Sequence, residues 1–250
     1  MHFEPLSLLF VGPIFDPLYL ILVGPTILLA LWAQFRVKST FHRWSQVATR
    51  SGMRGCDVAQ MLLHAAGLDA VKVERVGGFL SDHYDPRTRT LRLSEATHDS
   101  RSVAAIGVAA HETGHALQHA ENYAPLTFRS AIVPFVSIGS HLLPFLILIG
   151  IFSGVFVRGH VGTVAYAIIA VLIGIVVFSL VTLPVEFDAS KRALAVLANG
   201  GVLREDELTG ARAVLNAAAL TYVAAAASAI MELLYWASRL GLFGGRSSND

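Results

Sequence analysis

Residues 130–157 read SAIVPFVSIGSHLLPFLILIGIFSGVFV, and this run of twenty-eight residues without Asp, Glu, Lys or Arg decides the fold class of the chain. After Arg158, residues 159–185 form a second run that lacks these four residue types. A helix needs roughly 20 apolar residues to cross a bilayer core about 30 Å thick, and both runs exceed that length. They therefore predict membrane-spanning helices over about 132–157 and 161–185, joined as a hairpin.

Two further stretches are long enough to be considered as spans. Residues 17–35 precede Arg36 and contain no charged residue, which predicts a first membrane helix. Residues 213–231 also lack charge and contain nine alanines, but polar side chains such as Asn216 make this stretch less lipophilic. It is interpreted as a fourth span packed on other helices, with a buried helix outside the membrane as the alternative.

The composition agrees with a membrane protein and excludes several other classes. Hydrophobic residues make up 54% of the 250 residues and charged residues only 15%, which excludes a disordered chain and is unusual for a soluble globule. The formal net charge of +1 provides no strong field for binding nucleic acid, so no nucleic-acid partner is expected. Cys56 is the single cysteine, which excludes an intrachain disulfide and a cysteine-based zinc finger.

Basic residues indicate the orientation of the predicted spans. The hairpin connection offers only Arg158, whereas seven basic residues follow the first and third spans: Arg36, Lys38, Arg43, Arg50, Arg54, Lys191 and Arg192. The positive-inside rule places such residues in the cytoplasm. We therefore expect a multi-pass protein of the cell membrane, with an external N-terminus and with residues 36–130 on the cytoplasmic side. The lipid bilayer is the partner that this organisation requires.

Residues 36–130 carry most of the charge and predict a small α+β unit. The expected elements are a helix over 57–66, a strand over 71–76, a hairpin over 79–94 with its turn at 85–88, and a helix from Asp99 or Ser100 to about Ala120. Capping residues, the alternation of Val with charged residues and an Asp-Pro turn signal support these assignments.

The chain is thus expected to be a mainly α membrane protein with three or four transmembrane helices and one small α+β cytoplasmic unit. The expected segments are 1–35 with the first span, 36–130 as the cytoplasmic unit, 131–185 as the transmembrane hairpin, 186–212 as a second cytoplasmic segment, and 213–250 with the fourth span or buried helix and the C-terminal tail.

The last helix of the α+β unit contains His111-Glu112-Thr113-Gly114-His115. Two histidines four residues apart lie on one helical face about one turn apart, which suits two imidazole ligands on one Zn²⁺. The intervening Glu112 lies beside that face, where a carboxylate can take a proton from water. The alternative is a pair of histidines that satisfy their hydrogen bonds without a metal.

The surroundings of this motif favour a buried site. Residues 103–110 are small and apolar throughout, so the helix is expected to carry its histidines into an interior. Gly114 lowers helix propensity by about 1 kcal/mol relative to Ala, which suggests that another backbone approaches the helix closely there.

A catalytic zinc of this kind needs a third protein ligand. His119 continues the four-residue spacing, but on a straight helix it lies about 12 Å along the axis from His111, too far to share one ion. Glu186 is the first acidic residue after the predicted hairpin, and the chain returns there to the side that holds the histidines. A carboxylate at a membrane boundary is expected to be paired or coordinated. Glu186 is therefore the favoured ligand, with an ion pair to Lys191 or Arg192 as the alternative.

Four separated motifs resemble one known family. They read SDHYDPR at 81–87, HETGHALQH at 111–119, PVEFDAS at 184–190 and LNAAALTYV at 215–223. They are similar to motifs of the YugP-like family of bacterial membrane zinc metallopeptidases, and the resemblance covers nearly the whole chain, from about residue 16 to 236. The resemblance implies a zinc-dependent hydrolase.

More distantly, the arrangement is similar to the HtpX and CAAX-prenyl-protease gluzincins, whose second motif has the form Glu-x-x-Ala-Asp. Glu186 falls on the Glu of that motif, the third zinc ligand in those relatives, and Ala189 falls on its Ala. Ser190 stands where the relatives have an aspartate that supports the site. Asp188 comes two residues early and points about 200° around a helix from Glu186, so it is expected to pair with Arg192.

The resulting hypothesis is a membrane zinc endopeptidase of the gluzincin type. The residues that would hold one Zn²⁺ per chain are His111, His115 and Glu186. Glu112 would deprotonate water for attack on a peptide carbonyl, and His83 and Tyr222 are the two residues considered as donors to the developing oxyanion. The hairpin over 79–94 could bind an extended peptide as an added strand. The substrate is expected to be a peptide or protein, membrane proteins included.

Two other classes of function are alternatives to the peptidase. A non-proteolytic membrane scaffold could keep a zinc for folding stability, but a structural zinc has no need of Glu112 and is normally closed by a fourth protein ligand. A transporter would use ionisable groups within its spans, and these spans contain almost none beyond His141. The peptidase is the favoured interpretation.

Overall fold

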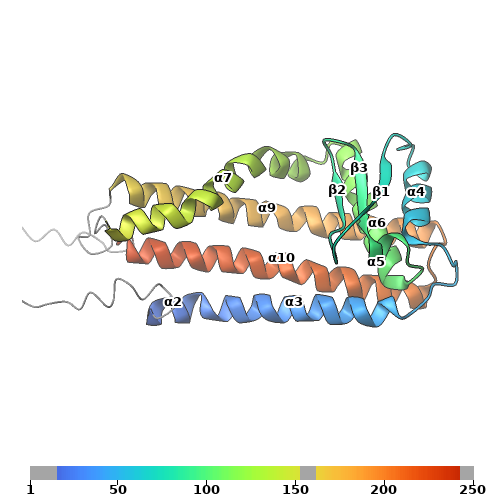
Figure 1. Cartoon of the computed structure of the whole chain (residues 1–250), viewed down its shortest axis with the longest axis horizontal. Coiled ribbons are helices and arrows are strands. Elements are labelled where there is room, and N and C mark those ends of the chain that lie inside the picture. The colour runs from blue at the N-terminus through green and yellow to red at the C-terminus, as the bar shows by residue number, and fades with distance from the viewer. Residues whose placement is uncertain (1–15, 153–161, 243–250) are drawn as a thin grey trace, which may run out of the picture. The chain divides into compact units, whose positions relative to one another are not determined.

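The computed structural model describes residues 16–152 and 162–242, which are mostly helical with one small sheet (Figure 1). The elements are α2 (Pro17–Leu22), α3 (Gly24–Ser45), α4 (Gly55–Ala65), β1 (Lys72–Val76), β2 (His83–Asp85), β3 (Thr90–Ser94), α5 (Glu95–His98), α6 (Val103–Ala120), α7 (Ala124–Phe152), α9 (Thr163–Asn199) and α10 (Glu205–Arg239). This confirms a mainly α protein with a small α+β part. The predicted hairpin connection around Arg158 and the two ends of the chain lie outside the described residues.

The described residues form two compact units. The helical unit comprises residues 16–31, 131–152, 162–180 and 223–242. Its core consists of Val23, Ile168, Leu172, Tyr235 and Trp236. Asp16 accepts a hydrogen bond from the Tyr235 hydroxyl at 2.9 Å and forms an ion pair with Arg239 at 3.0 Å, so the start of α2 is fixed to the end of α10.

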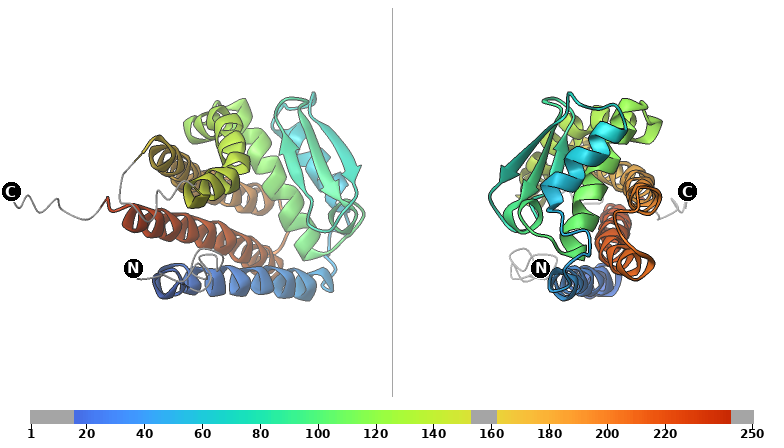
Figure 2. Two further views of the ribbon diagram at one scale, coloured as in Figure 1. Left: turned by 60° about the vertical axis from the view of Figure 1, so that its left-hand side comes forward. Right: turned by 90° about the vertical axis from the view of Figure 1, so that its right-hand side faces the viewer.

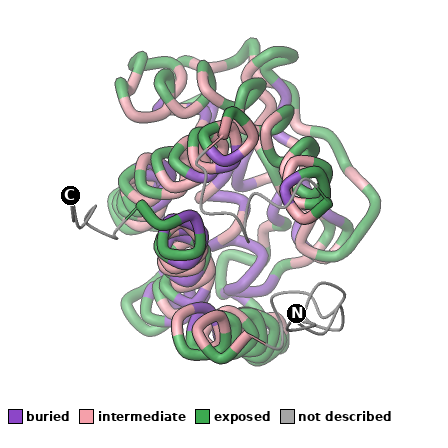
Figure 3. The backbone as a smooth tube through the Cα atoms, turned by 90° about the vertical axis from the view of Figure 1, so that its left-hand side faces the viewer, coloured by how far each residue is buried: buried purple, intermediate pink, exposed green. Residues whose placement is uncertain are grey.

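Three described helices, α7, α9 and α10, are long and apolar enough to cross a membrane. From Thr163 onward the predicted span over 161–185 lies in α9, the span over 213–231 lies in α10, and the described part of the span over 132–157 lies in α7. Large apolar side chains remain exposed on α7, with Phe135 and Phe152 at 76% each, as a surface that faces lipid requires. Exposed stretches, green in Figure 3, recur along the helices.

The predicted first span, residues 17–35, is not among these three helices. The chain there is divided at Val23 into α2 and α3. Pro25 has no amide hydrogen and cannot complete the helical hydrogen bond to the turn before it, which explains an interruption at this point. Helix α3 then continues through Arg36 and Lys38, so its apolar part is shorter than the charge-free stretch indicated.

The mixed unit comprises residues 32–130 and 181–222, and α6 lies at its centre. One face of α6 packs in a cluster with α4, α9 and α10, whose members include Val58, Leu62, Val103, Ile106, Ala110, Ala193, Leu197, Ala211 and Leu215. Another face contacts β3 and α4 through Ala109 and Ala116. Val103 and Ile106 have no exposed surface, which confirms the expectation of a buried helix.

The sheet has the strand order β1-β3-β2, with β3 parallel to β1 and antiparallel to β2. The views in Figure 2 show these three strands side by side and α4 beside them. The predicted hairpin is present, but its first arm begins at His83 rather than near residue 79. Leu80 has a positive φ of 54°, a backbone conformation that a strand does not contain, and this explains the shorter arm.

Helix α6 begins later than predicted. Asp99 and Ser100 follow the short helix α5, and α6 starts at Val103. Ser102 is its N-cap, since its hydroxyl accepts a hydrogen bond from the Ala105 amide at 3.2 Å. The predicted end near Ala120 is confirmed.

The contact between α6 and α9 depends on Gly114. A Cβ atom added at this position would lie 2.6 Å from the carbonyl oxygen of Ala189, so the two backbones meet without a side chain between them. This confirms the close approach suggested by the sequence. We expect Gly114→Ala to lower the free energy of unfolding by about 1–3 kcal/mol, the usual cost of overpacking.

The prediction can be checked by thermal unfolding of purified protein in a neutral detergent. Gly174→Ala is the matched control, because a Cβ atom there would have its nearest neighbour 4.0 Å away, at Val136. The control should unfold at the wild-type temperature or above it. Equal unfolding temperatures for Gly114→Ala and wild type would show that the α6–α9 contact tolerates a methyl group.

Candidate metal centre

Helices α6 and α9 bring together the three residues that the sequence predicted as ligands. His111, His115 and Glu186 each offer one ligand atom, and these three atoms lie within 4.8 Å of one another. The two histidines come from successive turns of α6, and Glu186 comes from the facing part of α9. Glu186 is 2% exposed, so its carboxylate is available to the interior of the mixed unit and not to bulk solvent.

The spacing of these atoms fits a tetrahedral zinc ion. The Nε2 atom of His111 lies 3.2 Å from Oε2 of Glu186, and the Nε2 atom of His115 lies 3.6 Å from the same oxygen. Ligand bonds of 2.0–2.1 Å in a tetrahedron place neighbouring ligand atoms about 3.3 Å apart. Two imidazoles and one carboxylate are also a donor set that zinc accepts. The residues therefore fit this metal.

Arg129 orients the Glu186 carboxylate. Its Nη1 atom lies 3.0 Å from Oε1 of Glu186, while Oε2 faces the two histidines. One oxygen is thus engaged by a guanidinium and the other points to the ligand group. This pairing differs from the predicted alternative, in which Glu186 would pair with Lys191 or Arg192.

Both histidines present Nε2 to the carboxylate because their Nδ1 atoms have other partners. Nδ1 of His115 lies 3.0 Å from Oε1 of Gln118, and Nδ1 of His111 lies 3.2 Å from the Ser190 hydroxyl. The Gln118 amide group donates to the carbonyl of Val185, which fixes Oε1 as the atom that accepts from His115. Outer partners of this kind set the tautomer of metal-binding histidines.

A chain of polar contacts supports Gln118 in turn. Its amide nitrogen also donates to Asp188 at 2.8 Å, and Asp188 accepts from Arg192 Nε at 2.5 Å. This confirms the predicted Asp188–Arg192 pair. Arg192 continues the chain to Glu121 at 2.7 Å. Asp188 thus acts on the site through Gln118, and Ser190 touches a histidine from the position of the relatives' aspartate.

Glu112 lies between the two histidines in the sequence, and it is buried, with only 7% of its surface exposed. Burial raises the pKa of its carboxyl above the ordinary value, and the charges of the histidines oppose that rise. A carboxylate in this environment is a stronger base than one in water. The position therefore suits proton transfer next to the ligand group.

The other residues considered from the sequence fall in different places. His119 is not in the ligand group, and its Nδ1 atom lies 2.8 Å from the Tyr84 hydroxyl. His83 is exposed, and its Nδ1 atom contacts the carbonyl of Ser81 at 2.8 Å. The phenol of Tyr222 is close enough to Glu186, Glu112 and Arg129 to interact with their charges. Tyr222 is thus the better placed of the two oxyanion donors considered.

Sequence reasoning missed Arg129 and Gln118. In the sequence, Arg129 only borders the charge-free run that begins at residue 130. It directly precedes the predicted hairpin and Glu186 directly follows it, so both were expected on the same side of the membrane, where a cation and an acid can pair. Gln118 lies one turn beyond His115 on the same face, a spacing that brings side chains into contact. That spacing was the available signal for Gln118.

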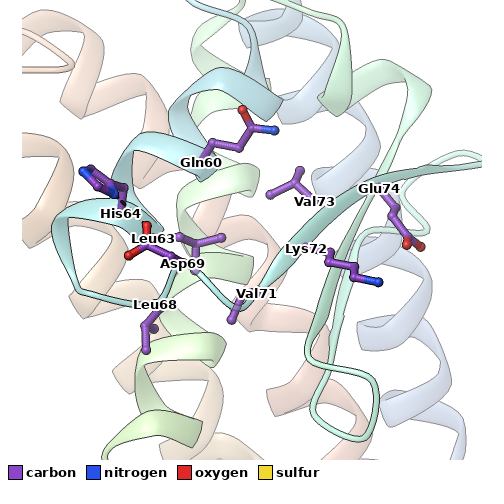
Figure 4. Close-up of a pocket in the computed structure, with 9 residues that line it drawn as sticks. All are labelled: Gln60, Leu63, His64, Leu68, Asp69, Val71, Lys72, Val73 and Glu74. Atoms are coloured by element: carbon purple, nitrogen blue, oxygen red, sulfur yellow. Dashed lines mark hydrogen bonds and ion pairs between the residues drawn. The ribbon is translucent and has the colours of Figure 1, made fainter.

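A separate hollow of about 570 Å³ lies between α4 and the edge strand β1 (Figure 4). Its lining includes His64 and Asp69, which are joined at 2.6 Å, together with Lys72 and Glu74. None of the metal-centre residues lines it. This hollow is therefore not a substrate-binding site for the metal centre.

The chain belongs to a family of zinc metallopeptidases. The family model described as "Putative neutral zinc metallopeptidase" matches residues 19–241, which include α6 and Glu186. A curated relative is "Putative membrane protease YugP" of Bacillus subtilis (strain 168), which is 46% identical over 206 residues, covering 82% of this chain and 89% of the relative. No solved structure matches the chain. These findings confirm the resemblance seen in the motifs, and with the three apolar helices they indicate a membrane protein.

The outer partner of His115 provides a prediction. We expect Gln118→Ala to weaken zinc binding by about 10- to 100-fold, the usual effect of removing such a partner. Competition with a fluorescent zinc chelator would measure the affinity. Gln60→Ala is the matched control, because Gln60 is exposed on α4 and lines the hollow of Figure 4. An unchanged zinc affinity in Gln118→Ala would contradict a supporting role.

Proposed function

We propose that this protein is an integral membrane zinc endopeptidase that hydrolyses peptide bonds with water. The observation that carries the proposal is that both Nε2 atoms face one oxygen of Glu186 while Glu112 lies buried beside them. Membership in a zinc metallopeptidase family supports the same conclusion. The proposed zinc ligands are His111, His115 and Glu186.

Zinc supplies a Lewis acid that makes water acidic enough to lose a proton near neutral pH. Glu112 accepts that proton as the water oxygen bonds to the peptide carbonyl carbon, and it delivers the proton to the nitrogen as the C–N bond breaks. Tyr222 is the proposed donor to the carbonyl oxygen while negative charge develops there. Arg129 keeps Oε2 of Glu186 turned toward the histidines.

We further propose that the substrate binds as an extended strand at β2. This strand lies at the edge of the sheet, so its outer backbone groups have no partner strand within the described sheet. An extended peptide can use such an edge through main-chain hydrogen bonds. Peptides and unfolded protein segments, including those of membrane proteins, meet this requirement.

The proposed location is the cell membrane, with several spans and with the metal centre on the cytoplasmic side. The support is the excess of Lys and Arg in residues 36–54 over the connection between α7 and α9. A reporter fused after Asp250 would measure the side of the C-terminus. An external C-terminus is expected if α10 crosses the membrane, and a cytoplasmic one would contradict that crossing.

Hydrolysis of casein by the purified full chain would test the activity. A chelator should abolish hydrolysis, and added Zn²⁺ should restore it. A zinc-loaded protein that does not cleave casein or unfolded membrane-protein fragments would favour the alternative, a scaffold that keeps zinc for stability. Persistent cleavage after complete metal removal would exclude a metallopeptidase.

A further inference from the structure

A second hollow, separate in its lining from the metal centre, lies between α3 and α10 in the mixed unit. Its volume is about 600 Å³. The residues that line it are Arg36, Ser39, Thr40, Arg43, Trp44, Ala213, Asn216, Ala217 and Leu220. The lining thus combines two cations, three neutral polar side chains and an apolar wall.

The two arginines give this hollow an uncompensated positive charge. Arg36 and Arg43 are both exposed and lie two turns apart on α3. Within the described residues neither forms an ion pair with a carboxylate, and no Asp or Glu lines the hollow. Their guanidinium groups lie instead over indole rings, Arg36 over Trp32 at 5.7 Å and Arg43 over Trp44 at 5.6 Å. The guanidinium groups of Arg36 and Arg43 are therefore available to bind an anion.

Neutral side chains add hydrogen-bonding capacity suited to phosphate oxygens. Thr40 carries a hydroxyl donor and Asn216 an amide donor, and both line the same hollow as the arginines. Arginine binds phosphate in a bidentate manner with charge-assisted hydrogen bonds. The polar part of the hollow therefore matches an anion with several oxygen atoms, such as a phosphate group, better than a simple halide.

The apolar part indicates what the phosphate is attached to. Leu220 and Ala217 line the hollow, and the exposed aromatic residues Trp32 and Phe35 precede Arg36 on α3, at 48% and 71% exposure. Aromatic and basic side chains together are typical of the membrane–water interface. A ligand with a phosphate headgroup and acyl chains would satisfy both parts of this surface.

We propose that the hollow between α3 and α10 binds the phosphate headgroup of an anionic phospholipid. The headgroup lies between Arg36 and Arg43, within reach of Thr40 and Asn216, and an acyl chain follows Phe35 and Trp32 along α3. The inference does not depend on the peptidase activity, since none of these residues belongs to the metal centre. The proposal specifies both the charge of the lipid headgroup and the residues that bind it.

Native mass spectrometry of the full chain from neutral detergent would test the proposal. The protein is offered equal amounts of phosphatidylglycerol and phosphatidylcholine, and bound lipid is counted. We expect a preference of about tenfold or more for phosphatidylglycerol, because only that lipid has a net negative headgroup. Inorganic phosphate in excess should not displace the lipid. Equal binding of the two lipids, or displacement by phosphate alone, would overturn the proposal.

Variants locate the site. The double variant Arg36→Gln with Arg43→Gln should lose the preference for phosphatidylglycerol. Lys38→Gln is the matched control, since Lys38 is an exposed cation on the same helix but does not line the hollow. An equal loss in Lys38→Gln would show general surface electrostatics and would contradict a defined site. The comparison of lipids on the wild-type chain decides the proposal even if the double variant is poorly folded.

Discussion

Glu112→Gln is expected to lower peptide hydrolysis by about 10²- to 10⁴-fold, the contribution typical of a general base. The amide has almost the shape of the carboxylate but cannot accept a proton from water at neutral pH. The buried position of Glu112 leaves little room for bulk water to replace it. The variant should keep its zinc, because Glu112 is not one of the three residues proposed as ligands.

Two measurements on the same sample separate the roles of base and ligand. Zinc content by elemental analysis should equal that of wild type, while casein cleavage should fall. Glu74→Gln is the control, because Glu74 is an exposed carboxylate on β1 whose partner is Arg92. The control should cleave at the wild-type rate. Wild-type cleavage by Glu112→Gln would remove Glu112 as the base.

The parts of the fold that could be predicted are those with a local or compositional signal. Charge-free runs located α7, α9 and α10, and the small apolar residues of 103–110 predicted the burial of α6. Boundaries were harder where a single residue decides them. Pro25 interrupts the first predicted span, and Leu80 shortens the first arm of the hairpin through its positive φ. A count of charged and apolar residues records neither the interruption of the helix before Pro25 nor the positive φ of Leu80.

The candidate site shows the same division. The four-residue spacing of the histidines and the return of the chain after the hairpin were sufficient to predict the group of His111, His115 and Glu186. The Arg129–Glu186 pair joins α7 to α9, so it depends on how these two helices pack, which no spacing within one helix determines. Arg129, 3.0 Å from Glu186, therefore became visible only with the packed helices, whereas Gln118, 3.0 Å from His115, had a signal in its three-residue spacing on α6.

Removal of Glu186 should have the largest effect on the metal. Glu186→Ala deletes the one carboxylate that faces both Nε2 atoms, and it also leaves Arg129 without that partner. Loss of an outer partner can weaken metal binding by up to about 100-fold, and we expect the loss of Glu186 to weaken zinc binding by more than that. Casein hydrolysis should fall in parallel. Unchanged zinc content by elemental analysis would remove Glu186 as a ligand.

A loss of zinc could also follow from a damaged fold, and two further variants distinguish these causes. Glu186→Gln keeps the volume of the side chain and an oxygen that can accept from Arg129, so it should fold yet still lose zinc. Glu207→Gln changes another buried glutamate, whose oxygens accept from the backbone amides of Arg50 and Arg204. Because its contacts are structural, this control should lower the unfolding temperature but retain zinc. Zinc lost equally from both Gln variants would mean that stability, and not ligation, controls metal binding.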